Sequence, residues 1–325
     1  MKRLWIVLLL LLLAGRADRK APETVQQAQV QEKDPVIDTT VQEVKTGLAV
    51  VGNIAKSMNA TPDFPGAAHT EVTYVALTLD QDGVIRQCCI DGVSAVIPFD
   101  ATGALQEEEE AFASKNELGD EYAMHKASAI GSEWREQADA FARYAVGRKV
   151  EELSHGDVAS SVTISTDGIL QAIAMAAETA VVQGAQVEDR LTLAILSHSD
   201  ESRSASLDTG EDGYAAFRTD VAAVTWRDGV VTSCLLDALE TEVPVTPEGL
   251  IGVELSTAQP SLTTISRASP LAANFYPAQD WCRRAERFAD SMLGKKVQEL
   301  ESSAITVSGG TQQAVFYALL HKAAQ

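Results

Sequence analysis

One pattern of residues occurs twice in the chain, and this repeat constrains the fold most. An Asp-Gly pair, a cysteine and an aspartate recur at one common offset: Asp82-Gly83, Cys88 and Asp91 first, then Asp228-Gly229, Cys234 and Asp237. A second stretch, led by Glu133-Trp134 and then by Asp280-Trp281, repeats at an offset one residue longer. Two matches at nearly one offset predict two homologous units of domain size.

Each copy predicts the same order of structural elements. Apolar runs on both sides of the Asp-Gly pair indicate an antiparallel β-hairpin. Residues with the spacing of an amphipathic helix follow an irregular segment: Trp134, Ala138, Phe141 and Ala145. A glycine suited to a left-handed helix end comes next in each copy: Gly147 and Gly294. We then expect a short strand and a final helix, over 168–180 in the first copy and 312–323 in the second.

Together these patterns predict an α+β fold. We expect two tandem homologous domains, over residues 41–182 and 183–325. Each is predicted to be an antiparallel hairpin sheet packed with helices.

The N-terminal residues are typical of an export signal. Lys2 and Arg3 precede an unbroken apolar run over residues 4–14. This run is shorter than the roughly 17–25 residues that a membrane-spanning helix needs. A cationic start followed by a short run that is apolar on every face favours a secretory signal over a buried or amphipathic helix. We therefore predict a signal segment over residues 1–16 and a mature protein at the cell surface or outside the cell.

The end of this segment decides how the protein is anchored. Residues 13–16 read Leu-Ala-Gly-Arg and resemble a bacterial lipoprotein signal, with Arg16 where the lipidated cysteine would stand. Without that thiol, the chain is either released or held by an uncleaved signal. Residues 17–40 are polar and contain Pro22 and Pro35, which predicts a flexible polar spacer.

Charge and motifs exclude several functions. The formal net charge is −20, so the surface repels phosphate backbones and nucleic-acid binding is not expected. Four cysteines without a Cys-x-x-Cys spacing give no basis for a thiolate zinc site. Nucleophile-elbow, P-loop, zincin and dinucleotide-binding patterns are absent from the sequence, so a hydrolase or kinase has no motif behind it.

Two further features have alternative interpretations. Cys88 and Cys234 occupy equivalent places and are either redox or metal ligands or small buried residues, of which we favour the second. The acidic run over 107–110 is either a cation-binding segment or a solvated loop, and we favour the loop.

Residues 157–165 carry the candidate chemistry and read D-V-A-S-S-V-T-I-S. This stretch resembles the flavin-attachment segment of the bacterial FMN-binding domain family. In family members with covalent flavin, a flavin transferase joins the FMN phosphate to the last threonine of the motif. The resemblance implies attachment to Thr163, with Asp157, Ser160 and Ser161 as the motif residues before it.

A second patch supports this resemblance. Residues 115–120 read K-N-E-L-G-D, and Glu117, Leu118 and Gly119 match a glycine-containing loop of the family that a tryptophan-led helix follows. The order resembles two-domain cell-surface flavoproteins of Gram-positive bacteria, over most of residues 45–180 and more weakly over 185–325. The resemblance implies an electron carrier rather than a substrate-converting enzyme. Its implied partners are membrane electron-donor proteins and a flavin transferase.

The residues themselves provide a separate physical argument. Thr163 supplies a hydroxyl just before an expected helix start, for which Thr166 is a candidate N-cap, and helix starts favour phosphate. Where the family has Gly-Ala, Ser161-Val162 stands here, and we expect Val162 to crowd the hydroxyl. In the second copy, Thr306 follows Ile305 and is the weaker candidate. The alternative for the segment is an edge strand and a capped helix without chemistry. For the chain, the alternative is a cofactor-free surface binding or structural module, and its oligomeric state stays open.

Overall fold

Each half of the chain begins with long antiparallel strands. The computed structural model describes residues 42–106, 111–158, 161–199, 202–255, 276–296, 298–299 and 312–325. The predicted signal segment and spacer therefore lie outside the described residues. In the first half, β1 (Glu43–Asn53), β2 (Gly66–Leu79) and β3 (Ile85–Phe99) pair in sequence order. In the second half, β6 (Arg190–Ser199), β7 (Gly213–Arg227) and β8 (Val230–Val245) do the same.

Both Asp-Gly pairs form the predicted hairpin turns. Asp228 and Gly229 have φ values of 51° and 75°, so both central residues of the β7–β8 turn are left-handed, as in the tight turns that suit twisted strands. In the β2–β3 turn, the carboxylate of Asp80 accepts the backbone N–H groups of Asp82 and Val84, each at 2.9 Å. The predicted hairpins are confirmed.

Each sheet is completed by a short fourth strand that lies between β3 and β6 in the sequence. The first sheet has the order β3-β2-β1-β5, where β5 (Val181–Gln186) follows the helices of the first half. The second has the order β4-β6-β7-β8, where β4 (Ala111–Phe112) comes from the first half. All pairings are antiparallel. The boundary expected after residue 182 falls inside β5.

Helices follow the strands in both halves. The first half has α1 (Lys115–Leu118), α2 (Trp134–Ala145) and α3 (Asp167–Glu178), and the second has α4 (Tyr276–Met292) and α6 (Gln312–Ala324). The described part of the first half also contains four 3₁₀ turns: η1 (Gly119–Tyr122), η2 (Met124–Lys126), η3 (Val150–Glu152) and η4 (Gly156–Val158). No helix of the described segments has the length and apolar character required to cross a membrane.

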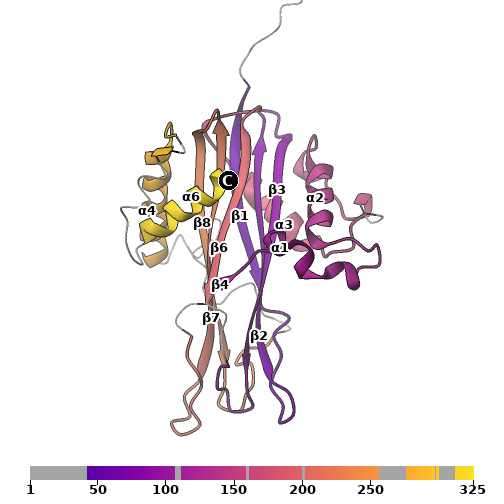
Figure 1. Ribbon diagram of the computed structural model, residues 1–325, viewed down its shortest axis with the longest axis vertical. Helices are drawn as coiled ribbons and strands as arrows, with labels where there is room; N and C mark the ends of the chain where they lie inside the picture. Colours follow the sequence, from indigo (N-terminus) through magenta and orange to yellow (C-terminus); the bar gives the residue numbers. More distant parts are fainter. Residues whose placement is uncertain are drawn as a thin grey trace, which may run out of the picture. The chain divides into compact units, whose positions relative to one another are not determined.

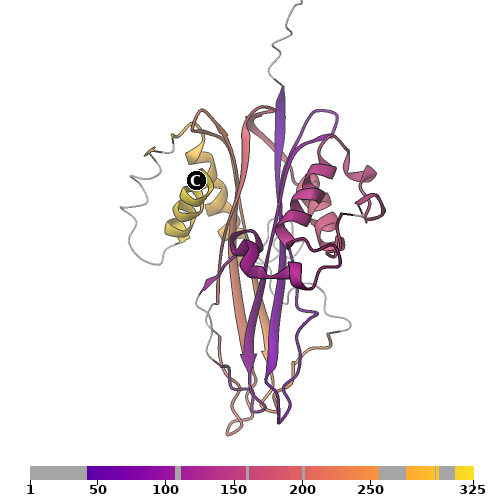
Figure 2. The same cartoon turned by 45° about the vertical axis from the view of Figure 1, so that its right-hand side comes forward.

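The elements stack in four layers, helices–sheet–sheet–helices, within residues 41–325, which form one compact unit. One apolar core lies between the two sheets. A second core joins the first sheet to α2 and α3, and a third joins the second sheet to α4 and α6. Figures 1 and 2 show the two pairs of helices on opposite sides of the strands. The α+β class with antiparallel sheets packed by helices is confirmed.

The two sheets are also joined by buried polar contacts. The hydroxyl of Tyr74, on β2, donates to Thr219 Oγ1 on β7 at 2.8 Å. Thr70 and Thr241 share a hydrogen bond of 3.1 Å between their hydroxyl oxygens. Both β2 and β7 are thus covered on two faces, and residues 74–79 are buried without alternation. Buried and half-buried residues alternate only over 66–73, because a helix layer and a second sheet cover both faces of the rest of the strand.

The predicted glycine ends of the tryptophan-led helices have matching contacts in the two halves. Gly147, with φ of 83°, donates its N–H to the carbonyl of Ile85 at 2.8 Å. Gly294, with φ of 77°, donates to the carbonyl of Val231 at 2.9 Å. In each half the end of the helix is fastened to the start of the hairpin's second strand, so the repeat in sequence corresponds to repeated local geometry.

One predicted element of the first half is absent. Between α2 and α3, the described residues form η3 and η4 rather than the expected short strand. The apolar residues there do not pair with a sheet edge, because Val158, Val162 and Ile164 are buried in the core between helices and sheet. These apolar residues therefore pack against the helices and the sheet face rather than forming a strand.

Candidate functional site

The candidate attachment residue, Thr163, lies on an extended segment before α3. Its neighbours Val162 and Ile164 are buried, whereas Thr163 itself is exposed. Val162 packs into the core shared by α2, α3 and the first sheet. Since Val162 is buried and Thr163 is exposed, the two side chains point to different sides, which argues against the expectation that Val162 crowds the hydroxyl.

A buried glutamine of α2 holds this segment in place. The side-chain oxygen of Gln137 accepts the N–H of Thr163 at 2.7 Å, the N–H of Ile164 at 3.2 Å and the hydroxyl of Thr163 at 3.1 Å. Its amide nitrogen donates to the carbonyl of Ser132 at 3.1 Å and to the hydroxyl of Ser128 at 3.3 Å. Gln137 is fully buried, so these five contacts fix the backbone beneath the Thr163 hydroxyl.

Sequence reasoning missed Gln137, although the sequence contained a signal. Gln137 lies one helical turn after Trp134 and one before Phe141, on the apolar face of the predicted helix. A polar residue at such a position is buried, and a buried amide needs hydrogen-bond partners. The pattern therefore pointed to a polar contact without indicating its partner.

The start of α3 differs from the expected cap. Thr166 is the N-cap residue, but its side chain makes no capping hydrogen bond to the helix backbone. Its hydroxyl instead pairs with His155 Nδ1 at 2.8 Å. Thr163 lies three residues before this cap, so its hydroxyl is near the helix start but is not part of the capping structure.

The second sequence patch forms a capped turn. Ser114 and Glu117 form a capping box: the N–H of Ser114 donates to Glu117 Oε2 at 2.8 Å, and the N–H of Glu117 donates to Ser114 Oγ at 3.2 Å. Leu118 is half-buried and ends α1. Gly119 is buried with φ of 52°, and a β-carbon there would lie 3.0 Å from the guanidinium of Arg135. Gly119 is therefore favoured by its left-handed backbone conformation, whereas the guanidinium of Arg135 is a flexible side-chain end that can shift.

The first turns of α2 connect the two patches. Arg135 lies against Gly119 and pairs with Asp120 at 2.9 Å, while Gln137 holds the segment of Thr163. At the helix start, the carboxylate of Glu133 accepts two backbone N–H groups of η2 and pairs with His125. Burial raises the pKa of Glu133, but the hydrogen bonds from His125 and η2 outweigh it and hold that pKa below its usual value. Within the described residues, no hydrogen bond or ion pair joins Thr163 directly to the Glu117–Gly119 turn.

A charged cluster packs against the turn that contains α1. Lys115 is buried, pairs with Glu71 and lies 5.0 Å from the centre of the Trp134 ring. Burial raises the pKa of Glu71, but its hydrogen bond with His69 and the charge of Lys115 hold that pKa well below its usual range. Nearby, burial raises the pKa of Asp91 to about 6, although it accepts backbone N–H groups. These groups position α1 rather than face Thr163.

Three of the predicted site residues cannot be placed. Ser160 and Thr306 lie outside the described residues, and only the backbone of Asp157 is described. Ser161 is exposed, and its hydroxyl donates to the carbonyl of Val158 at 3.2 Å. The acidic run over 107–110 also lies outside the described residues.

The two equivalent cysteines have environments that favour a structural role. Cys234 is fully buried and Cys88 is half-buried, and burial raises the pKa of the Cys88 thiol above its usual value, which keeps the reactive thiolate form scarce. Within the described ranges, no group of three or more histidine, cysteine, aspartate or glutamate side chains is arranged to hold a metal ion.

No protein-family model, curated protein or solved structure matches the chain. The functional argument therefore rests on the geometry above and on the residues themselves.

Proposed function

We propose that the chain is an exported FMN-binding protein that acts as an extracytoplasmic electron carrier, with the FMN phosphate esterified to Thr163. The observation that carries this proposal is the exposed Thr163 hydroxyl on a backbone anchored from both sides by Val162, Ile164 and Gln137. An attachment residue must present its hydroxyl to an enzyme and hold its backbone still, and this segment does both.

The contact with Gln137 defines how the segment would respond to attachment. The Thr163 O–H donates to the Gln137 oxygen, and this bond would be lost when the ester forms. The two backbone N–H groups of Thr163 and Ile164 would keep the same oxygen as their acceptor. Attachment would therefore cost one exposed hydrogen bond and leave the buried ones intact. The flavin itself supplies the redox chemistry, and the protein supplies position and electrostatics.

The wider proposal covers the partners and the origin of the fold. A flavin transferase and membrane electron-donor proteins are the partners that such a carrier needs outside the cytoplasmic membrane. The repeated order of strands and helices and the matched contacts of Gly147 and Gly294 support two homologous halves, one derived from the other by duplication. Thr306 would be the matching attachment residue of the second half.

A cofactor-free surface module is the second candidate, and one observation favours it. Gln137 satisfies every hydrogen-bond donor of Thr163, while Glu117 pairs with Lys322 of α6. Both sequence patches therefore have structural contacts that require no cofactor.

Intact-mass measurement separates the two candidates. The full chain is produced with and without an active flavin transferase and a flavin donor. The flavin proposal expects a mass increase of one esterified FMN, retained in Thr163→Ser and lost in Thr163→Ala. Ser165→Ala, at an exposed hydroxyl two residues away, is the matched control and should label like the original chain. An unmodified, colourless chain beside a labelled reference acceptor would leave the cofactor-free module.

A further inference from the structure

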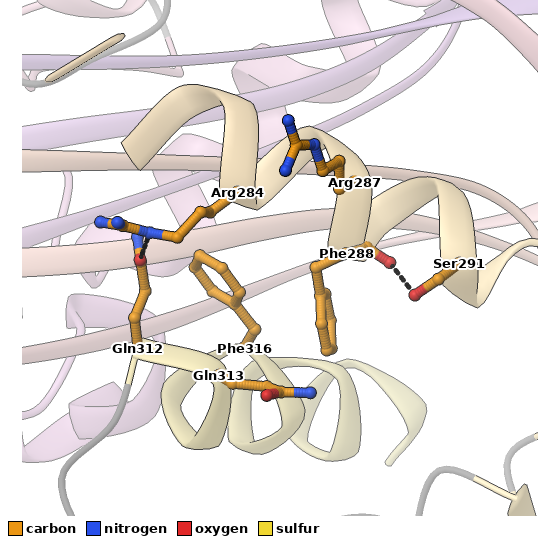
Figure 3. A pocket seen from close by; sticks show the side chains of 7 residues that line it. All are labelled: Arg284, Arg287, Phe288, Ser291, Gln312, Gln313 and Phe316. Atoms are coloured by element: carbon orange, nitrogen blue, oxygen red, sulfur yellow. Dashed lines mark hydrogen bonds between the residues drawn. The ribbon is translucent and has the colours of Figure 1, made fainter. Parts of the chain in front are cut away.

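A cavity of about 550 Å³ lies between α4 and α6, in the half that carries the weaker attachment motif. Figure 3 shows Phe288 and Phe316 facing each other between the helices, with Arg284 and Arg287 along α4 and Gln312 at the start of α6. The centres of the two phenylalanine rings are 5.2 Å apart. The cavity thus combines an aromatic wall with guanidinium groups, and its volume suits a small organic molecule.

Gln312 presents an unsatisfied donor in this cavity. Its side-chain oxygen accepts from Arg284 Nε at 2.5 Å, so its amide nitrogen lies on the other side of the planar group. That nitrogen is buried and has no hydrogen-bond partner among the described residues. A buried donor without an acceptor is destabilising, so the Gln312 amide favours an occupant that carries a hydrogen-bond acceptor.

The local charge has the opposite sign to that of the whole chain. Arg284 shares its charge with Asp280. Arg287 forms no ion pair with any residue of the described segments. The cavity therefore keeps one uncompensated guanidinium in a protein whose formal net charge is −20. A guanidinium has donors only and binds carboxylate and phosphate oxygens through paired hydrogen bonds.

The two halves carry different residues at the helix position that faces this cavity. By the helix repeat, Gln137 of α2 occupies the place of Arg284 of α4. In the first half, the Gln137 oxygen accepts N–H groups from the chain's own backbone. In the second half, the same place on the helix carries a cation that donates. The first-half position thus accepts from the backbone, whereas the second-half position donates to Gln312 and turns the Gln312 amide nitrogen toward another partner.

We propose that the cavity between α4 and α6 binds a small aromatic phosphate or carboxylate. The oxyanion would contact Arg287 and the amide nitrogen of Gln312, and the ring would pack against the side of the Phe288–Phe316 pair that lines the cavity. This site goes beyond the proposed function, because it needs neither Thr163 nor a covalent flavin.

Isothermal titration calorimetry tests the site on the full chain made without a flavin transferase, so that its result is independent of labelling at Thr163. Phenyl phosphate and benzoate are the probes, and inorganic phosphate is the comparison. Arg287→Gln removes the cation that is unpaired among the described residues. Gln312→Glu places a carboxylate beside the bound anion. The matched control is Arg283→Gln, which removes the same charge from the same helix outside the cavity lining. Thermal unfolding of each variant establishes that it is folded.

We expect one probe molecule per chain and an affinity about 10-fold or more weaker in Arg287→Gln and Gln312→Glu, as the loss of a charge-assisted hydrogen bond requires. Arg283→Gln should bind within about 2-fold of the original chain. The site is refuted if neither aromatic probe binds, or if Arg283→Gln weakens binding as much as Arg287→Gln. Inorganic phosphate binding as tightly as phenyl phosphate would overturn the aromatic part of the proposal.

Discussion

Replacing Gln137 with leucine should destabilise the protein by about 2 kcal/mol, because the change removes five hydrogen bonds but few apolar contacts. The largest loss is at the Ile164 N–H, which is buried and would keep no acceptor, at a cost of about 1–3 kcal/mol. The Thr163 hydroxyl belongs to an exposed side chain and can turn to water, so its loss adds only tenths of a kcal/mol, and the partly buried Thr163 N–H adds less than the Ile164 N–H. Burial of the leucine side chain offsets part of the sum.

Urea unfolding and hydrogen exchange measure the two parts of this prediction. Unfolding of Gln137→Leu should begin at lower urea concentration than that of the original chain, and the Ile164 amide should lose protection while β2 keeps it. Gln171→Leu makes the same chemical change on the exposed face of α3 and should alter stability by less than about 0.5 kcal/mol. If Gln137→Leu matches Gln171→Leu in stability and in exchange, the glutamine does not anchor the segment.

Three further outcomes follow from the structure. Burial raises the folded pKa of Asp91 from 3.8 to about 6, so the folded chain holds a proton that the unfolded chain releases; in urea unfolding, the stability of the original chain relative to Asp91→Asn should therefore fall as pH rises between these values, and a constant difference would contradict this. Tyr74→Phe should cost only about 1 kcal/mol in the same assay, since Thr219 keeps its 2.8 Å bond to Ser197; a loss above about 3 kcal/mol would contradict this. Gly47→Ala places a β-carbon 2.1 Å from a carbonyl oxygen of α3 and should cost about 3 kcal/mol in thermal unfolding; an unchanged midpoint would contradict that contact.

The local elements were predictable because their signals are local. The Asp-Gly pair at 228–229 supplies two left-handed residues, which fixes a hairpin from two positions. The spacing of Trp134 and Phe141 marks the buried face of α2, and both side chains are indeed in the core. Gly147 marks the helix end by the same kind of evidence.

The arrangement of the sheets was not predictable, because it depends on contacts between distant residues. β4 contains only two residues, so its pairing with β6 leaves no pattern in the sequence. Burial of residues 74–79 on both faces did leave a signal, an apolar run that only Thr78 interrupts, but such a run does not say what covers each face. The same limit applies to Gln137, whose burial was readable and whose partners, Thr163 and Ile164, were not.

The position of β5 determines how late in synthesis the first sheet can be completed. The first sheet needs residues 181–186 as its last strand, and its inner face is covered by β7 and β8, which end at residue 245. A ribosome has therefore made three quarters of the polypeptide before the apolar side of the earliest strands can be shielded from water. Until then the nascent chain exposes an apolar surface, and chaperones that bind such surfaces have a long interval in which to bind it.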